Sequence, residues 1–130
     1  MNESQHQHSF IMWFGQQYPE HRGLLFEVNN NVYSLHHASK RRSMGMVAGV
    51  SDLILVLPNS GKTVGIELKA PGSIHNKDHI RQQVEWGKKV VDNGGFYYIT
   101  SDLDHLKNVI ERTLKGEKIY QDLSNISNKF

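Results

Sequence analysis

Two carboxylates and one lysine near the middle of the chain have the types and spacing needed for metal-assisted hydrolysis. Glu67 and Lys69 are two residues apart in an apolar segment, so in a β-strand both side chains point to the same face. Asp52 begins the preceding apolar segment. With a turn centred near Ser60, Asp52 lies eight residues before the centre and Glu67 seven residues after it. An antiparallel hairpin therefore places the two carboxylates nearly opposite each other.

Carboxylate oxygens in a chain without cysteine favour Mg²⁺ or Mn²⁺ as the bound ion. The backbone carbonyl of Leu68 is a further candidate ligand. An ion held by Asp52 and Glu67 would polarise a phosphodiester and lower the pKa of a bound water. Lys69 would hold the attacking water or stabilise the pentacovalent transition state. The alternative is a surface salt bridge among the three residues, which contributes less than about 1 kcal/mol when exposed.

The eight histidines raise zinc as another alternative. His75 and His79 have the i, i+4 spacing of a helix face, and His36 and His37 are adjacent. A zinc hydrolase needs three converging ligands, and the sequence contains no H-E-x-x-H motif. We therefore favour Mg²⁺ or Mn²⁺, and we expect the histidines to strengthen phosphate contacts at mildly acidic pH.

The segments that must position these residues alternate between helix and strand patterns. The patterns predict a helix over 3–18 ended by Pro19, a strand over 24–28, one or two helical turns over 39–46, strands over 52–57 and 63–69 joined by a turn at 58–62, a helix over 78–91, a strand over 96–100, and a helix from 101 or 102 to 114. This order predicts an α/β fold with a central mixed β-sheet flanked by helices.

The length and composition are those of one globular domain. The chain has 130 residues, of which 38% are hydrophobic and 22% charged. We expect a single domain over 1–116 and a polar, loosely held tail over 117–130. No run of 18 apolar residues and no signal-peptide pattern is present, and cysteine is absent, so we expect a cytoplasmic protein without membrane association or disulfides.

A compact basic run precedes the first of the two carboxylates. The net charge of +2 is too small to indicate a nucleic-acid partner, but Lys40, Arg41 and Arg42 are consecutive. In a nuclease these side chains would contact phosphates, and Gly45 and Gly49 would permit close backbone approach to a phosphate. The alternative for the basic run is an ordinary solvated surface.

Several segments together resemble the VRR-NUC branch of the PD-(D/E)XK nuclease superfamily. They are the run Gly45-Met46-Val47-Ala48-Gly49-Val50-Ser51-Asp52-Leu53, the run Ile66-Glu67-Leu68-Lys69, the run Gln83-Val84-Glu85-Trp86, and Gly94 or Gly95. The similarity spans the chain from Glu3 to about Thr100. The combined order and spacing are specific, whereas the pattern of an aspartate followed by E-x-K alone is not.

The resemblance implies a role for each residue that matches the family's motif. Asp52 and Glu67 would be metal ligands and Lys69 the catalytic lysine. Gln83 and Trp86 match the family's Q-x-x-W signature on the following helix, with Gln83 as a catalytic residue.

Other matches are partial. Glu3 and Gln7 resemble the family's opening helix, whose glutamate completes the metal site. Ser51 stands where the motif usually has proline, which changes the local backbone restraint but not the carboxylate. After the first strand, only Asn30 matches a histidine–x–proline–asparagine stretch, so Glu27 either assists the site or is an edge-strand surface residue; we favour the surface.

The resemblance also implies a function and partners. Stand-alone members of this branch resemble Holliday-junction resolvases of bacteria and phage, so we expect an endonuclease for branched DNA, acting as a symmetric homodimer in a bacterial or phage-infected cytoplasm. No sequence-reading module is present, so recognition would use DNA backbone and shape. The apolar residues of the first helix are candidates for the dimer surface: Phe10, Ile11, Trp13 and Phe14.

Two other functions remain open at this point. One is a module that binds DNA ends or junctions on the same fold without cutting them. The other is a sequence-specific restriction enzyme, which usually needs base-reading extensions longer than we expect in 130 residues.

Overall fold

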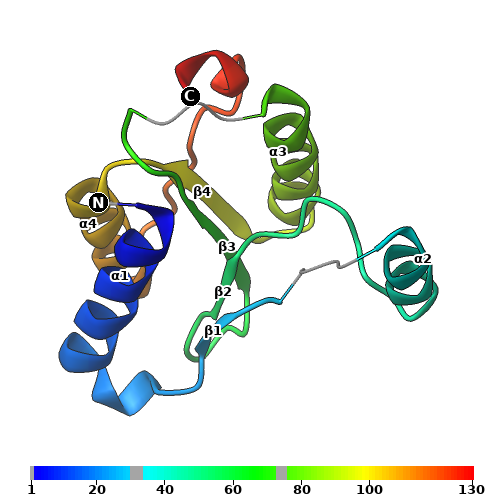
Figure 1. Cartoon of the computed structure of the whole chain (residues 1–130). Helices are drawn as coiled ribbons and strands as arrows, with labels where there is room; N and C mark the ends of the chain where they lie inside the picture. Colours follow the sequence, from blue (N-terminus) through cyan, green and yellow to red (C-terminus); the bar gives the residue numbers. More distant parts are fainter. Residues whose placement is uncertain (1, 30–33, 73–75) are drawn as a thin grey trace.

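The computed structural model describes residues 2–29, 34–72 and 76–130 (Figure 1). Its elements are α1 (Glu3–Gln17), η1 (Pro19–His21), β1 (Leu25–Glu27), α2 (Leu35–Ser43), β2 (Leu53–Val56), β3 (Thr63–Leu68), α3 (Lys77–Asp92), β4 (Phe96–Thr100), α4 (Leu103–Leu114) and η2 (Ile126–Lys129), where η denotes a 3₁₀ helix. None of the helices in these ranges combines the length and the apolar composition needed to cross a membrane.

The four strands form one mixed sheet in the order β1-β2-β3-β4. The pairs β1–β2 and β2–β3 are antiparallel, and β3–β4 is parallel because α3 crosses over between them. Helices α1 and α4 lie against one face of the sheet and α3 against the other (Figure 1). The predicted α/β architecture with a central mixed sheet is confirmed.

Alternation along β3 separates two hydrophobic clusters. Val64, Ile66 and Leu68 are buried in the cluster that includes Phe10 of α1 and Ile110 of α4. The intervening residues of β3, among them Glu67, point to the face that α3 covers. The Glu67 carboxylate therefore lies under α3, on the side of the sheet opposite the larger core.

Two glycines let α3 approach the sheet closely. A Cβ atom at Gly87 would lie 2.4 Å from the ring of Tyr97, and one at Gly65 would lie 2.7 Å from Trp86 and 2.9 Å from Tyr97. The Tyr97 ring thus fills the space that both glycines leave open. This contact fixes the position of α3, and with it Gln83, relative to β3.

Helix α2 is the element whose predicted bounds differ most from the structure. The prediction was 39–46, whereas α2 runs over Leu35–Ser43. It begins earlier because the Ser34 side chain accepts a hydrogen bond from the His37 backbone N–H, which caps the first turn. It ends at Gly45, which has φ +104° and so adopts the left-handed conformation that terminates helices.

The aromatic side chains of α1 are divided between the core and the surface. Phe10 is 0% exposed and Phe14 3% exposed, and both belong to the larger core. The hypothesis that they form a dimer surface is therefore wrong, since neither is available to a partner. Trp13 packs against the same core, and Ile11 is exposed at 36%.

The C-terminal segment beyond Gly116 is held against β4. The Gln121 side chain accepts a hydrogen bond from the Ile99 backbone N–H at 2.9 Å and donates one to the Ile99 carbonyl at 2.8 Å. The Tyr98 hydroxyl donates to the Ile119 carbonyl at 2.7 Å, and Ile126 is buried beside α3. The expectation of a loosely held tail is therefore wrong. A polar composition does not reveal that one amide side chain can form the two backbone hydrogen bonds that a neighbouring strand would form.

Candidate active site

The hairpin of β2 and β3 brings the two carboxylates together. Leu53 pairs with Ile66, so Asp52 and Glu67 occupy the next opposed positions, as the count from the turn predicted. The Asp52 backbone N–H donates a hydrogen bond to Glu67 Oε1 at 2.8 Å. Opposed residues of an antiparallel pair share a face, so both carboxylates lie on the side of α3.

Glu67 is completely buried, and burial changes its titration. Its side chain is 0% exposed, and Oε2 accepts no hydrogen bond from the described residues. Burial and, second, the neighbouring Asp52 carboxylate raise the pKa of Glu67 to about 9, although the Lys69 ammonium acts in the opposite direction. Without a further positive charge, Glu67 is therefore protonated at neutral pH.

Lys69 connects the end of β3 to the first turn of α1. Its Nζ atom lies 3.9 Å from Glu67 Oε2 and 3.9 Å from Glu3 Oε1, and its side chain is only 5% exposed. The Lys69 backbone N–H donates to the Thr100 carbonyl, which extends the pairing with β4 by one residue. Glu3 is positioned by the α1 N-terminus, where Asn2 and Gln5 form a capping box. The structure therefore brings Glu3 to the same site.

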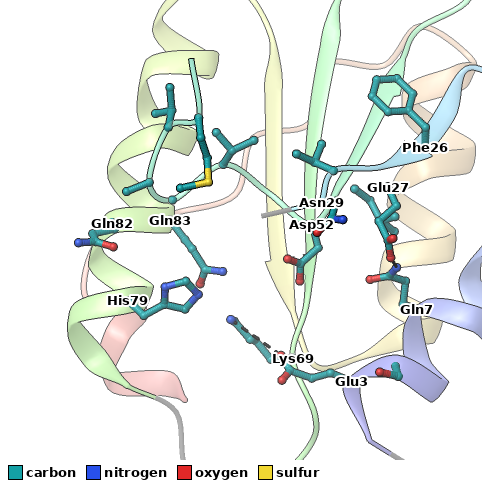
Figure 2. Close-up of a pocket in the computed structure, with 18 of the residues that line it drawn as sticks. Glu3, Gln7, Phe26, Glu27, Asn29, Asp52, Lys69, His79, Gln82 and Gln83 are labelled. Carbon is teal, nitrogen blue, oxygen red and sulfur yellow. Dashed lines mark hydrogen bonds and ion pairs between the residues drawn. The ribbon is translucent and has the colours of Figure 1, made fainter. Parts of the chain in front are cut away.

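Asp52 and Lys69 lie at the floor of a pocket of about 990 Å³ that Glu3 also lines, and the buried Glu67 lies beside them, behind the pocket surface (Figure 2). Its walls come from α1, the β1 edge, the loop over 46–50 and the N-terminal half of α3. The polar side chains that line it are Glu3, Ser4, Gln7, His8, Glu27, Asn29, Asp52, Lys69, Asn76, His79, Gln82 and Gln83. A negatively charged floor with one ammonium, open to solvent on one side, suits a phosphate bridged to carboxylates by a cation.

The wall formed by α3 contributes Gln83 and His79, one helical turn apart. Gln83 is 2% exposed, and its Oε1 atom has no hydrogen-bond partner among residues 2–29, 34–72 and 76–130. Figure 2 shows both side chains turned into the pocket, toward Lys69. Gln83 was predicted from the sequence as a site residue, whereas His79 was considered only as a zinc ligand. The i, i+4 spacing of histidines does not reveal which face of α3 meets the pocket.

Glu27 lies at the rim of the pocket. It pairs with Leu53 across β1–β2, so its side chain projects toward α1, on the face opposite to Asp52. There Gln7 Nε2 donates a hydrogen bond to Glu27 Oε2 at 2.6 Å. This link between α1 and β1 was not anticipated from the sequence. Asn30, the other residue whose role the sequence left open, lies outside the described residues.

The basic run and its two glycines are not all at the pocket. Lys40, Arg41 and Arg42 are exposed on α2, which stands apart from the sheet in Figure 1 and does not line the pocket. Gly49 does line it, with φ +85°, but a Cβ there would lie 2.4 Å from the carbonyl oxygen of Gln82. The close approach that Gly49 permits in the structure is therefore to the backbone of α3.

The residues at the floor fit a hard divalent cation. Two carboxylates face each other, and one buried carboxylate oxygen lacks a hydrogen bond, which is unfavourable unless another group binds it. Within the described ranges, no group of three or more His, Cys, Asp or Glu side chains is placed to hold a metal ion. A cation at Asp52 and Glu67 would therefore complete its coordination with the Leu68 carbonyl and with water, as Mg²⁺ commonly does.

The fold defines the class of protein to which the chain is similar. A mixed sheet with α1 and α4 on one face and α3 on the other, and an acidic pair at the open end of its hairpin, agrees with the α/β nuclease fold predicted from the sequence.

Comparison with solved structures gives this fold a more particular description. A structure described as a VRR_NUC domain protein superposes with a TM-score of 0.69 at 21% sequence identity, covering 95% of this chain and 98% of that chain. The resemblance to VRR-NUC is thus confirmed at the level of the fold. No family model and no curated protein matches the sequence.

Proposed function

We propose that the protein is a Mg²⁺- or Mn²⁺-dependent endonuclease that hydrolyses phosphodiester bonds in DNA. The observation that carries this proposal is that Asp52 and Lys69 line one large pocket while the buried Glu67 contacts both of them. A structural salt bridge would not require a fully buried glutamate with a pKa of about 9. The shared fold with a VRR_NUC domain protein supports the same class of reaction.

Each floor residue has a separate task in this reaction. Asp52, Glu67 and the Leu68 carbonyl would hold the cation, which polarises the phosphodiester and lowers the pKa of a bound water. The Lys69 ammonium stabilises the negative charge that develops on the phosphate oxygens, in a position fixed by Glu67 and Glu3. Gln83 would accept a hydrogen bond, through its unpartnered amide oxygen, from a water that completes the coordination of the cation.

The substrate we propose is branched DNA, such as a four-way junction, bound through its backbone. Among the described residues, the walls of the pocket contain no helix that projects to read base edges, and three consecutive exposed basic residues, Lys40, Arg41 and Arg42, lie on α2, next along the chain to the loop over 46–50. A DNA strand in the pocket would continue toward α2. Symmetric cutting of two opposed strands requires two such sites, which a homodimer would supply.

Lys69→Ala is expected to abolish cleavage without weakening DNA binding strongly. Removing the ammonium that faces the developing charge should lower the rate by about 10²- to 10³-fold. The measurement is cleavage of a labelled four-way junction with Mg²⁺ or Mn²⁺, together with a gel-shift assay of binding in Ca²⁺. Lys62→Ala, at the turn of the same hairpin, is the matched control and should cleave normally. Equal binding without cleavage by wild type and Lys69→Ala would instead support a non-cutting junction-binding module.

Replacing Lys40, Arg41 and Arg42 together by glutamine is expected to weaken junction binding while leaving the rate at saturating protein unchanged. Three fewer phosphate contacts should reduce the slope of log Kd against log salt by up to about 3. A triple glutamine variant of Lys62, Lys115 and Lys118, which line a separate pocket near the hairpin turn, controls for charge. Equal salt slopes for the two triple variants would exclude α2 as the DNA contact.

A further inference from the structure

His79 is a titratable side chain in the pocket that the proposed reaction has not yet used. It is exposed, it lies in the first turn of α3, and it lines the same pocket as Asp52 and Lys69. Figure 2 shows its imidazole on the α3 wall beside Gln83, facing across the pocket toward the Lys69 side chain. The floor residues and His79 thus approach the pocket from two different walls.

Hydrolysis of a phosphodiester needs groups on two sides of the phosphorus atom. The attacking water and the leaving oxygen lie roughly in line, so the residues that assist departure must come from the wall opposite the attack. Ion pairs with Glu3 and Glu67, each 3.9 Å from its ammonium, hold the Lys69 side chain at the floor of the pocket. The amides of Gln82 and Gln83 are not acids. His79 is therefore the side chain on the α3 wall whose chemistry allows it to give a proton to a leaving oxygen.

We propose that His79 is a further catalytic residue of the nuclease reaction proposed above, on which this inference rests, and that it protonates the leaving 3′-oxygen. The bond from the water oxygen to phosphorus forms while the bond from phosphorus to the 3′-oxygen breaks. The electron pair of the broken bond stays on the 3′-oxygen, which takes a proton from the imidazolium of His79. The proton released by the water leaves to solvent through the open pocket. The products are a 5′-phosphate and a 3′-hydroxyl.

Charged groups lie near His79 on its own helix and across the pocket. On its own helix, Asp78 and Arg81 form an ion pair with each other. Across the pocket, the groups that face α3 are Lys69 and Asp52 at the strand ends, with Glu3 of α1 behind Lys69.

His105 provides a matched control outside the pocket. It is exposed in the first turn of α4, and it does not line the pocket. Replacing it changes the same type of side chain at a similar place in a helix without affecting the α3 wall.

The test compares two junction substrates at the mapped cleavage position, one with the natural 3′-oxygen and one with a bridging 3′-sulfur, in Mg²⁺. A thiolate leaves without protonation, so loss of a general acid affects only the oxygen substrate. His79→Gln should cut the oxygen substrate about 10²-fold more slowly than wild type and the sulfur substrate at nearly the wild-type rate. His105→Gln should cut both substrates normally.

Other outcomes would overturn the role of His79. Equal slowing on both substrates would show that His79 only contacts a phosphate, and no slowing on either would show that it takes no part. A wild-type protein that binds the junction but cuts neither substrate would contradict the proposed function itself, and the role of His79 with it. Circular dichroism of each variant checks folding, which an exposed position should preserve.

Discussion

Glu67→Gln is expected to abolish divalent-cation binding and DNA cleavage and, at the same time, to stabilise the metal-free protein. The substitution removes a ligand charge but keeps the oxygen that accepts the Asp52 backbone hydrogen bond. It also removes the only completely buried carboxylate among the described residues, whose charged form is unfavourable in the absence of a cation. The same side chain is thus needed for activity and costly for stability.

The direction of the pH effect follows from the raised pKa. Glu67 changes from an ordinary value of 4.5 to about 9 on folding, so the folded chain holds a proton that the unfolded chain releases between these values. This contribution to stability is fully present below pH 4.5 and is lost as the pH rises to about 9, by up to about 1.4 kcal/mol per pH unit. A cation that displaces this proton should bind about tenfold more tightly for each unit of rising pH.

Thermal unfolding in EDTA between pH 5 and pH 9, together with Mn²⁺ titration calorimetry, measures both effects. Wild type should lose stability across this range more steeply than Glu67→Gln, and Mn²⁺ in place of EDTA should raise the unfolding temperature of wild type but not of Glu67→Gln. Glu85→Gln, an exposed carboxylate on α3, is the control and should resemble wild type. Parallel pH profiles for wild type and Glu67→Gln would show that Glu67 is not held neutral in the metal-free protein.

Gly49→Ala is expected to lower both stability and activity. A Cβ at this position would lie 2.4 Å from the Gln82 carbonyl oxygen, and the residue has φ +85°, so backbone strain and overpacking act together. We expect a loss of about 3 kcal/mol in the free energy of unfolding. Because Asp52 follows three residues later, displacement of the loop from α3 should also move one carboxylate of the site.

Gly116→Ala separates these two causes. Gly116 has φ +92°, but nothing lies within 4 Å of a Cβ built there, so only the backbone strain remains. Urea unfolding should show a loss of about 1 kcal/mol for this variant. A similar loss of stability at both glycines would mean that the loop can move away from α3 at no added cost. Close packing against α3 would then not be what positions Asp52.

The arrangement of the hairpin could be predicted because it depends on local rules. Alternation places Glu67 and Lys69 on one face of β3, and the length of the turn sets the register that opposes Asp52 to Glu67. Both rules act over fewer than twenty residues. The order of helices and strands follows similarly from the spacing of apolar residues, as does the mixed sheet.

The remainder of the site depends on contacts between distant segments. No local pattern shows that α3 covers Glu67 and raises its pKa, or that His79 turns into the pocket, because both depend on how Gly87 packs against Tyr97. The start of α2 was misplaced because a single side-chain cap at Ser34 outweighed the weak hydrophobic pattern. The docking of the tail was missed because it too depends on a single side chain, that of Gln121.

The position of the acidic pair within a single hairpin has a consequence for how the chain folds. Asp52 and Glu67 are 15 residues apart, so their meeting closes a short loop at little entropic cost, and hairpins of this kind form in roughly 1–10 μs. The parallel pairing of β4 must wait until the α3 crossover is built. The carboxylates therefore come together while still hydrated, and dehydration of Glu67 falls on the later step in which α3 closes over the sheet. The free energy needed to dehydrate the Glu67 carboxylate therefore adds to the barrier of this late step and not to the barrier of strand pairing.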